Sequence, residues 1–257
     1  MNILQTSELS IGYSQKSEPK IVASNISISL KEGKLIGLVG VNGIGKSTLL
    51  RTLTGIQKPL TGTINLQEKP LESYTSLALA QQISVVLTEK LPPSNLTVYE
   101  LIALGRQPYT NWLGKLTTED KNQIDKAIFL TEINHLINQK YSEISDGQLQ
   151  KVLIARALAQ DTPLIVLDEP TTHLDLVHKV SMFKFLKKLS QETNKCILYS
   201  THDIDLAIQL SDEMIVMTDG KVVQNEPCQL ILDGTFSNLF SSENIFFDAE
   251  KGKFIIR

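Results

Sequence analysis

One run of the sequence, LVGVNGIGKSTLLRTLTG from Leu38 to Gly55, carries residue types that bind phosphate. Within it, eight residues from Gly40 onward fit the pattern G-x-x-x-x-G-K-[ST] between an apolar run and leucines at helical spacing. Glycines let backbone N–H groups approach an anion, which the N-terminus of the following helix also attracts. Lys46 would contact the β- and γ-phosphates of a nucleotide, and the Ser47 hydroxyl would ligate Mg²⁺. The nucleotide-binding set predicted here also includes Asn42, Gly43, Gly45 and Thr48.

A second run, PLIVLDEP, supplies carboxylates at the end of an apolar strand pattern. Asp168 is predicted to help hold Mg²⁺, and Glu169 to polarise the water that attacks the γ-phosphate. Two acids at a strand end could instead simply cap a turn. The phosphate-binding run favours the metal and catalytic interpretation, because ligands bind at the carboxyl ends of parallel strands.

The elements that position these residues alternate between strand and helix patterns, which predicts an α/β fold with a mostly parallel sheet. Short strand patterns at the beginning predict an additional antiparallel β subdomain, and helix patterns after QISVVL predict an inserted helical subdomain. We expect a nucleotide-binding core in residues 1–88 and 161–227, divided by a helical subdomain in residues 89–160. Residues 228–257 are expected to form a small extension with a β-hairpin.

Composition restricts the function classes further. The 257 residues are 42% hydrophobic and carry a net charge of −3, which argues against a generally basic nucleic-acid binder. Cys196 and Cys228 lack metal-ligand spacing and are expected to be free thiols in a reducing compartment. We find no signal-peptide pattern and no apolar run of ~20 residues that would span a bilayer.

With these motifs the sequence resembles the ATP-binding-cassette (ABC) ATPases, a family of P-loop NTPases, over most of its length. ISDGQ, at residues 144–148, is similar to their LSGGQ signature motif, with Asp146 in place of the first glycine. The resemblance implies that Ser145, Gly147 and Gln148 contact ATP bound to the opposite subunit of a head-to-tail dimer. Ser145 is also expected to cap the helix that begins here. The negative charge of Asp146 would be repelled by a nearby phosphate group, which would weaken ATP binding at this position.

Other positions match the family in order along the chain. Tyr13 resembles the aromatic residue that stacks on adenine, and Asp175 resembles the residue at the subunit boundary. His202 resembles the histidine that contacts the γ-phosphate; the strand before it is expected to neighbour the Asp168 strand. The family's glutamine after the QISVVL strand is replaced by Thr88, which would ligate Mg²⁺ or position water; Glu89 is an alternative.

The resemblance is strongest to the ATPases of importers for iron–siderophore complexes, haem and cobalamin. Those ATPases commonly carry a GR-x-P-[HY] run, which here reads Gly105–Tyr109, although a polar helix and loop with a solvated Arg106 is an alternative. The resemblance implies an ATPase that uses ATP and Mg²⁺, and that forms a homodimer or a pair of different cassettes. We expect the chain to lie at the cytoplasmic face of the membrane, bound to a separate permease. A substrate-binding protein is expected as an indirect partner. Alternatives are an importer of zinc, manganese or another solute, and a soluble ATPase that drives a cytoplasmic assembly such as an iron–sulfur cluster scaffold.

Overall fold

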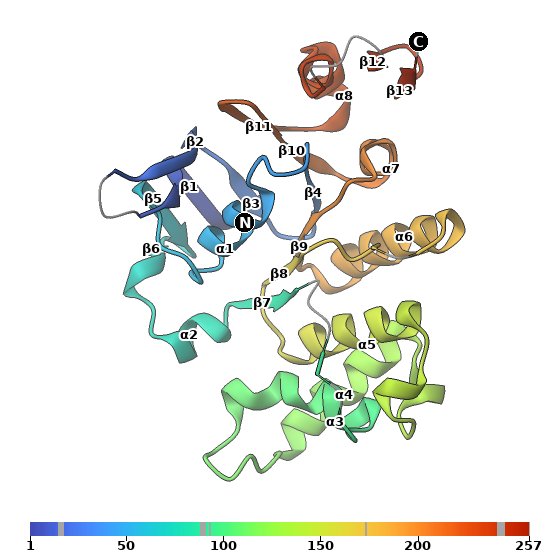
Figure 1. The fold of residues 1–257 in the computed structure, drawn as a ribbon. Helices are drawn as coiled ribbons and strands as arrows, with labels where there is room; N and C mark the ends of the chain where they lie inside the picture. The colour runs from blue at the N-terminus through green and yellow to red at the C-terminus, as the bar shows by residue number, and fades with distance from the viewer. Residues whose placement is uncertain (15–17, 88–90, 93, 173, 241–244, 257) are drawn as a thin grey trace.

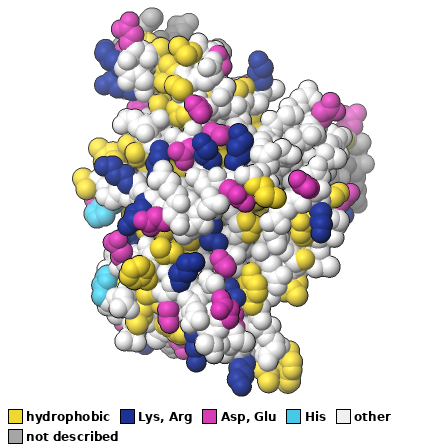
Figure 2. Space-filling model, turned by 180° about the vertical axis from the view of Figure 1, so that it is seen from behind, with side chains coloured by type: hydrophobic (Ala, Val, Ile, Leu, Met, Phe, Trp, Pro, Cys, Tyr) yellow, Lys and Arg dark blue, Asp and Glu magenta, His cyan; other side chains and the backbone are white. Residues whose placement is uncertain are grey.

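Two large sheets and a group of helices form the chain in the computed structural model (Figure 1). The structure describes residues 1–14, 18–87, 91–92, 94–172, 174–240 and 245–256. The helical part and the C-terminal hairpin lie at opposite ends of the molecule, with the central sheet between them. On the face seen in Figure 2, positive and negative side chains are interspersed.

The central sheet has six strands in the order β11-β10-β4-β9-β8-β7, and all neighbouring pairs except β10–β11 are parallel. Its strands are β4 (Leu35–Gly40), β7 (Ile83–Val86), β8 (Leu164–Leu167), β9 (Cys196–Ser200), β10 (Glu213–Thr218) and β11 (Lys221–Asn225). β4, β8 and β9 are buried along their whole length, as expected for parallel strands that are covered on both faces.

The second sheet is antiparallel and has five strands. These are β1 (Asn2–Tyr13), β2 (Lys20–Ile26), β3 (Ser29–Lys31), β5 (Thr61–Leu66) and β6 (Lys69–Pro70). It shares one hydrophobic core with helix α1 (Lys46–Leu53) and with alternate residues of the central sheet, such as Ile36 and Val166. α1 is therefore packed against both sheets.

The other face of the central sheet packs against long helices. The core on this face joins Leu35 and Val39 of β4 to α5 (Asp146–Ala159) and α6 (Leu176–Thr193). Each fully buried leucine, isoleucine or phenylalanine side chain contributes about 1.5–3 kcal/mol by leaving water. α5 thus connects the helical part of the molecule to the sheet that carries the phosphate-binding run.

Apart from the 14-residue helix α4, the remaining elements are short. The helical part also contains α3 (Val98–Ala103), α4 (Thr118–Thr131) and the 3₁₀ helices η2 (Leu104–Tyr109), η3 (Asn134–Leu136) and η4 (Tyr141–Glu143). η1 (Leu71–Ser73) and α2 (Ser76–Ala80) precede β7; α7 (Ile204–Leu210), α8 (Pro227–Leu232), η5 (Thr235–Asn238), β12 (Ile245–Asp248) and β13 (Lys253–Ile256) follow β9. Within the described residues, no helix is both long enough and apolar enough to cross a membrane.

The predicted fold class is confirmed: the mostly parallel sheet, the antiparallel sheet and the inserted helices are all present. The strand-like run NISISL, at residues 25–30, does not form one strand but divides between β2 and β3. Residues 27–28 separate the two strands, and Asn25, with a left-handed φ of 54°, lies just before the end of β2. The proposed subdomain boundaries stay a prediction.

Candidate functional site

The phosphate-binding run forms a tight turn between β4 and α1. Gly43 and Gly45 have φ values of 78° and 113°, a region that residues with a side chain rarely adopt. Gly45 is the N-cap of α1, and no side chain caps this helix end. The first backbone N–H groups of α1 are therefore left for an anion, which the partial positive charge of the helix end also attracts.

Lys46 is folded back over this turn. Its Nζ donates hydrogen bonds to the carbonyl oxygens of Gly40, at 2.9 Å, and Val41, at 3.3 Å. Burial lowers the pKa of Lys46, while the negative charges of Glu169 and Asp168 oppose that shift. The ammonium group thus lies between the loop backbone and the two carboxylates, where a phosphate group could replace the carbonyl contacts.

Asp168 and Glu169 follow β8, whose neighbour β9 ends beside them in a parallel pair, as expected from the sequence. The Ser47 hydroxyl donates to Asp168 Oδ2 at 3.4 Å, so residues from α1 and from β8 meet here. A hydroxyl and a carboxylate are hard oxygen donors, which Mg²⁺ binds together with phosphate oxygens and water. The chemistry of these donors therefore fits Mg²⁺.

Glu169 and His202 are in direct contact. Glu169 Oε1 lies 2.5 Å from His202 Nε2, and Glu169 Oε2 accepts a hydrogen bond from the Thr172 hydroxyl at 3.2 Å. Glu169 also has a left-handed backbone, with φ of 50°, which is uncommon for a residue with a side chain. Both its backbone and its carboxylate are thus held in a specific conformation at the end of β8.

Ser200, the last residue of β9, was not among the residues predicted from the sequence. Its hydroxyl contacts Asp168 and the backbone N–H of Glu169. Its position two residues before His202, on a strand expected beside the Asp168 strand, was the only signal that pointed to it.

Tyr13 lies at the end of β1, beside α1. Its hydroxyl is hydrogen-bonded to Thr48 Oγ1 at 3.1 Å, and 45% of the residue is exposed. An exposed ring next to a phosphate-binding turn can stack on a nucleotide base. Asn42 is exposed on the turn itself.

The predicted signature residues form the N-terminus of α5. Ser145 caps the helix, and its side chain and that of Gln148 accept hydrogen bonds from each other's backbone N–H groups, which forms a capping box. The helix-capping role expected for Ser145 is therefore present. No hydrogen bond described for Ser145, Gly147 or Gln148 joins them to the phosphate-binding turn of the same chain.

Asp175 caps the next long helix. It accepts a hydrogen bond from the backbone N–H of His178 at 2.9 Å, and this bond lowers the pKa of Asp175. Its side chain is exposed, as is that of His178. Thr88 and its alternative Glu89 lie outside the described residues.

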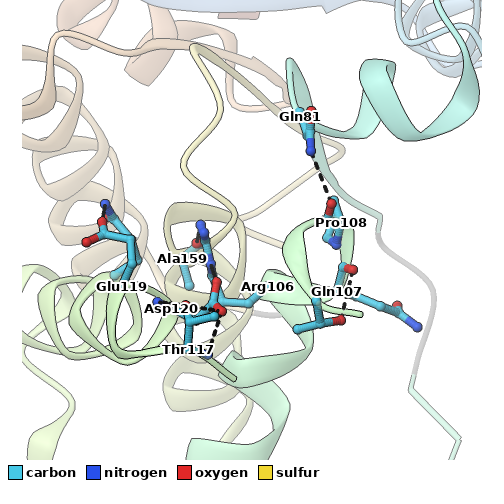
Figure 3. A network of polar contacts seen from close by, with 10 residues as sticks. Gln81, Arg106, Gln107, Pro108, Thr117, Glu119, Asp120 and Ala159 are labelled. Carbon is cyan, nitrogen blue, oxygen red and sulfur yellow. Dashed lines mark hydrogen bonds and ion pairs between the residues drawn. The ribbon is translucent and has the colours of Figure 1, made fainter. Parts of the chain in front are cut away.

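The run Gly105–Tyr109 has a structural role in the helical part of the molecule (Figure 3). Arg106 Nε donates to Asp120 Oδ1, and Nη1 donates to the carbonyl oxygen of Ala159, both at 2.8 Å. Its guanidinium also stacks on the Tyr109 ring, 3.9 Å from the centroid. The interpretation with a solvated Arg106 is wrong, because only 4% of this residue is exposed.

Comparison with known proteins now assigns the class of protein. The family described as ABC transporter matches residues 23–172, more than half of the chain, and the chain belongs to this family. It is an ATP-binding subunit and an ATPase, and ATPases of this family work with membrane permease components and dimerise.

Its relatives include subunits of iron importers. The iron(3+)-hydroxamate import ATP-binding protein FhuC of Bacillus subtilis is 36% identical over 87% of this chain and 82% of its own length. The ferric enterobactin transport ATP-binding protein FepC of Escherichia coli is 31% identical over 95% and 89%, respectively. The cassette MJ0796, solved as a dimer bound to ADP and Pi, superimposes with a TM-score of 0.73 at 27% identity, covering 88% of this chain and 99% of MJ0796.

Proposed function

We propose that this ATPase powers the import of a metal chelate, such as an iron–siderophore complex, haem or cobalamin, through a separate membrane permease. The relatives FhuC, for iron(3+)-hydroxamate import, and FepC, for ferric enterobactin transport, support this substrate class. The observation that carries the ATP-hydrolysing part of the proposal is the meeting of three segments at the ends of β4, β8 and β9, in which Lys46, Glu169 and His202 converge.

In the proposed reaction, backbone N–H groups at Gly43 and Gly45 and the Lys46 ammonium bind the phosphates of ATP. Ser47 and Asp168 would hold Mg²⁺, which when bound neutralises phosphate charge. The Glu169 carboxylate accepts a proton from the attacking water, or orients that water, as a general base does. His202 holds Glu169 through the 2.5 Å contact, and we assign to it a contact with the γ-phosphate when ATP is bound.

We further propose that two copies of the chain bind ATP between them. Ser145 and Asp175 are exposed helix caps, and a second copy could present its phosphate-binding turn to Ser145, Gly147 and Gln148. The dimeric state of the related MJ0796 cassette supports this arrangement. Closing and opening of such a dimer would transmit ATP hydrolysis to the permease.

The proposed location is the cytoplasmic face of the membrane, with the permease bound to the chain and a substrate-binding protein on the other side. The helical part of the molecule offers a rigid frame for such a contact. Gln81 Nε2 donates to the carbonyl oxygen of Pro108 at 3.1 Å, and this bond ties η2 to the end of α2 next to β7 (Figure 3). A displacement of η2 would therefore reach β7, whose Val86 carbonyl accepts a hydrogen bond from the Asp168 N–H at 2.9 Å.

The experiment that tests this proposal is affinity purification of the tagged full chain from gently solubilised membranes. We expect a many-spanning permease to co-purify, and we expect metal-chelate uptake by cells to require both the permease and Glu169. The catalytic variant Glu169→Gln is the matched control, since it should still co-purify but should not support uptake. Recovery of cytoplasmic partners alone, with the chain absent from membranes, would contradict the transporter function and favour an assembly ATPase.

A further inference from the structure

We propose that Ser200 is a positioning residue for ATP hydrolysis, which sets the Mg²⁺-binding carboxylate and the catalytic base relative to each other through one hydroxyl group. The proposal rests on the function proposed above, in which Asp168 helps to hold Mg²⁺ and Glu169 activates water. Ser200 itself would contact neither the nucleotide nor the metal ion.

The Ser200 hydroxyl forms one hydrogen bond as a donor and one as an acceptor. Its hydroxyl donates to Asp168 Oδ1 at 2.6 Å and accepts from the backbone N–H of Glu169 at 2.9 Å. The residue is completely buried, with 0% of its surface exposed. In a buried site a hydrogen bond is stronger than in water, and a donor that loses its acceptor is costly.

The position of Ser200 in the sheet makes it a rigid reference point. Ser200 pairs with Leu38 of β4, and the N–H of Thr201 donates to the Leu38 carbonyl oxygen at 3.1 Å. β9 therefore lies between the strand that leads into the phosphate-binding turn and the strand that leads into the carboxylates. Because β9 is paired with β4, the Ser200 hydroxyl holds Asp168 and Glu169 at a fixed position relative to the phosphate-binding turn.

The two groups that Ser200 contacts both need to be fixed. One oxygen of Asp168 faces Ser200, which leaves Oδ2 directed to the Ser47 hydroxyl at 3.4 Å, where Mg²⁺ would bind. Glu169 has the left-handed φ of 50°, a conformation that persists only when its surroundings hold it. The hydrogen bond from the Glu169 N–H to Ser200 is one such restraint, and it aims the side chain toward His202.

A comparison of Ser200→Thr with Ser200→Val tests the role of the hydroxyl group, because the two introduced side chains have the same shape. Ser200→Thr keeps the hydroxyl, whereas Ser200→Val has the same branched outline without it, and both side chains suit a strand. We expect Ser200→Val to lower kcat about 5- to 150-fold relative to Ser200→Thr, as expected for the loss of a buried hydrogen bond. Measured on the full chain with its permease, KM for ATP should agree within about twofold between the two variants, and Ser200→Val should need more Mg²⁺ for half-maximal activity.

A buried serine outside the site provides the control. The Ser190 hydroxyl in α6 donates to the Lys187 carbonyl oxygen at 2.8 Å, and the residue is also 0% exposed. Ser190→Val should lower the melting temperature but leave kcat per folded molecule and the Mg²⁺ requirement unchanged.

The outcomes separate the two proposals. If the wild-type complex hydrolyses ATP and the Ser200→Thr and Ser200→Val variants have equal kcat and equal Mg²⁺ requirement, the role of Ser200 is overturned and the proposed function stands. If the wild-type complex hydrolyses no ATP, the proposed function fails, and the positioning role of Ser200 fails with it. A lower kcat for Ser200→Val, with ATP affinity retained, supports the proposal.

Discussion

At the scale of single residues, Glu169 illustrates how the site restrains one side chain. Its N–H donates to Ser200, one carboxylate oxygen contacts His202, and the other accepts from Thr172. These partners come from the end of β9 and from the loop after β8, which are fixed by neighbouring strands. The base proposed for water activation is thus held before any substrate binds, which reduces the reorganisation that catalysis needs.

Replacement of Glu169 by glutamine should separate ATP binding from turnover. The amide has nearly the same shape but cannot accept a proton, so we expect ATP hydrolysis to fall by about 10²- to 10⁴-fold. ATP affinity should stay within a few-fold of the wild type, because the phosphate contacts of Lys46 and the turn remain. Phosphate release and calorimetric ATP binding measure the two properties, and retained turnover would exclude Glu169 as the base.

Replacement of Tyr13 tests the proposed adenine contact. Base stacking on an aromatic side chain contributes about 1–3 kcal/mol, so Tyr13→Ala should weaken ATP binding by about 5- to 150-fold. Tyr13→Phe keeps the ring but removes the hydrogen bond to Thr48, and it should bind ATP nearly as well as the wild type. Equal affinity of the alanine and phenylalanine variants, measured by calorimetry, would show that the ring does not stack on the base.

At the scale of elements, the buried pair of Arg106 and Asp120 organises the helical part of the molecule. The exposed fractions of the two side chains are 5% and 3%, respectively. The pair joins η2 to the first turn of α4, and the Arg106 contact with the Ala159 carbonyl adds the end of α5. Removing one member would leave a buried charge without its partner, which typically costs about 3–5 kcal/mol.

The same pair should make stability depend on pH. Burial raises the pKa of Asp120, but hydrogen bonds from Thr117 and Arg106 outweigh this effect and lower it overall. Because its pKa is lower in the folded chain than the ordinary value of 3.8, Asp120 contributes stability above that value. This contribution should be lost as the pH falls from about 4 toward the folded-state pKa.

Urea unfolding between about pH 3 and pH 7 measures this contribution. Asp120→Asn should be less stable than the wild type at neutral pH, and the difference should shrink on acidification. Glu119 is one residue earlier in α4 and exposed, so Glu119→Gln is the matched control and should change stability by less than about 0.5 kcal/mol. A difference between Asp120→Asn and the wild type that does not vary with pH would contradict this role of Asp120.

Features of the fold and the site that depend on consecutive residues could be predicted from the sequence, whereas most features that depend on contacts between distant segments could not. The phosphate-binding turn could be predicted because its residues are consecutive and their types are restricted by close backbone approach and helix capping. The proximity of His202 to Glu169 could be predicted from the expected neighbouring strands. The role of Ser200 could not, because a serine at a strand end is ordinary until its partners on another strand are known. The buried state of Arg106 likewise depends on α4 and α5, which meet only in three dimensions.

At the scale of the whole molecule, the charge at the N-terminus of α5 bears on the proposed dimer. Asp146 is exposed in the first turn of α5, where a negative side chain stabilises the helix by about 0.3–1 kcal/mol. In the proposed dimer the same charge lies near phosphate of the second copy, and this repulsion opposes association. Two like charges about 4 Å apart in water repel by about 1 kcal/mol, or about fivefold in an equilibrium constant.

Because both copies in the dimer carry the substitution, the factor of about five applies at each of two equivalent sites, so Asp146→Asn should strengthen ATP-dependent dimerisation by about 25-fold at low salt. The substitution is best made in the Glu169→Gln background, where ATP is not consumed, and dimerisation measured by sedimentation. Glu119→Gln removes a charge from the first turn of another helix and is the control for a general effect of net charge. Unchanged or weaker dimerisation of Asp146→Asn would argue against phosphate near this position.

The order of strands in the central sheet has a consequence for the folding of the chain during its synthesis on the ribosome. β4, which carries the phosphate-binding turn, is flanked by β9 and β10, although about 155 residues of chain separate β4 from β9. While the N-terminal half emerges, β4 has neither of its hydrogen-bonded neighbours, and only its face toward the antiparallel sheet, with Ile36 and Leu38, has residues to pack against. A nascent chain of this topology can therefore complete its nucleotide-binding site only after β9 and β10 have been synthesised, and until then the edges of β4 are unpaired, a state that is prone to aggregation.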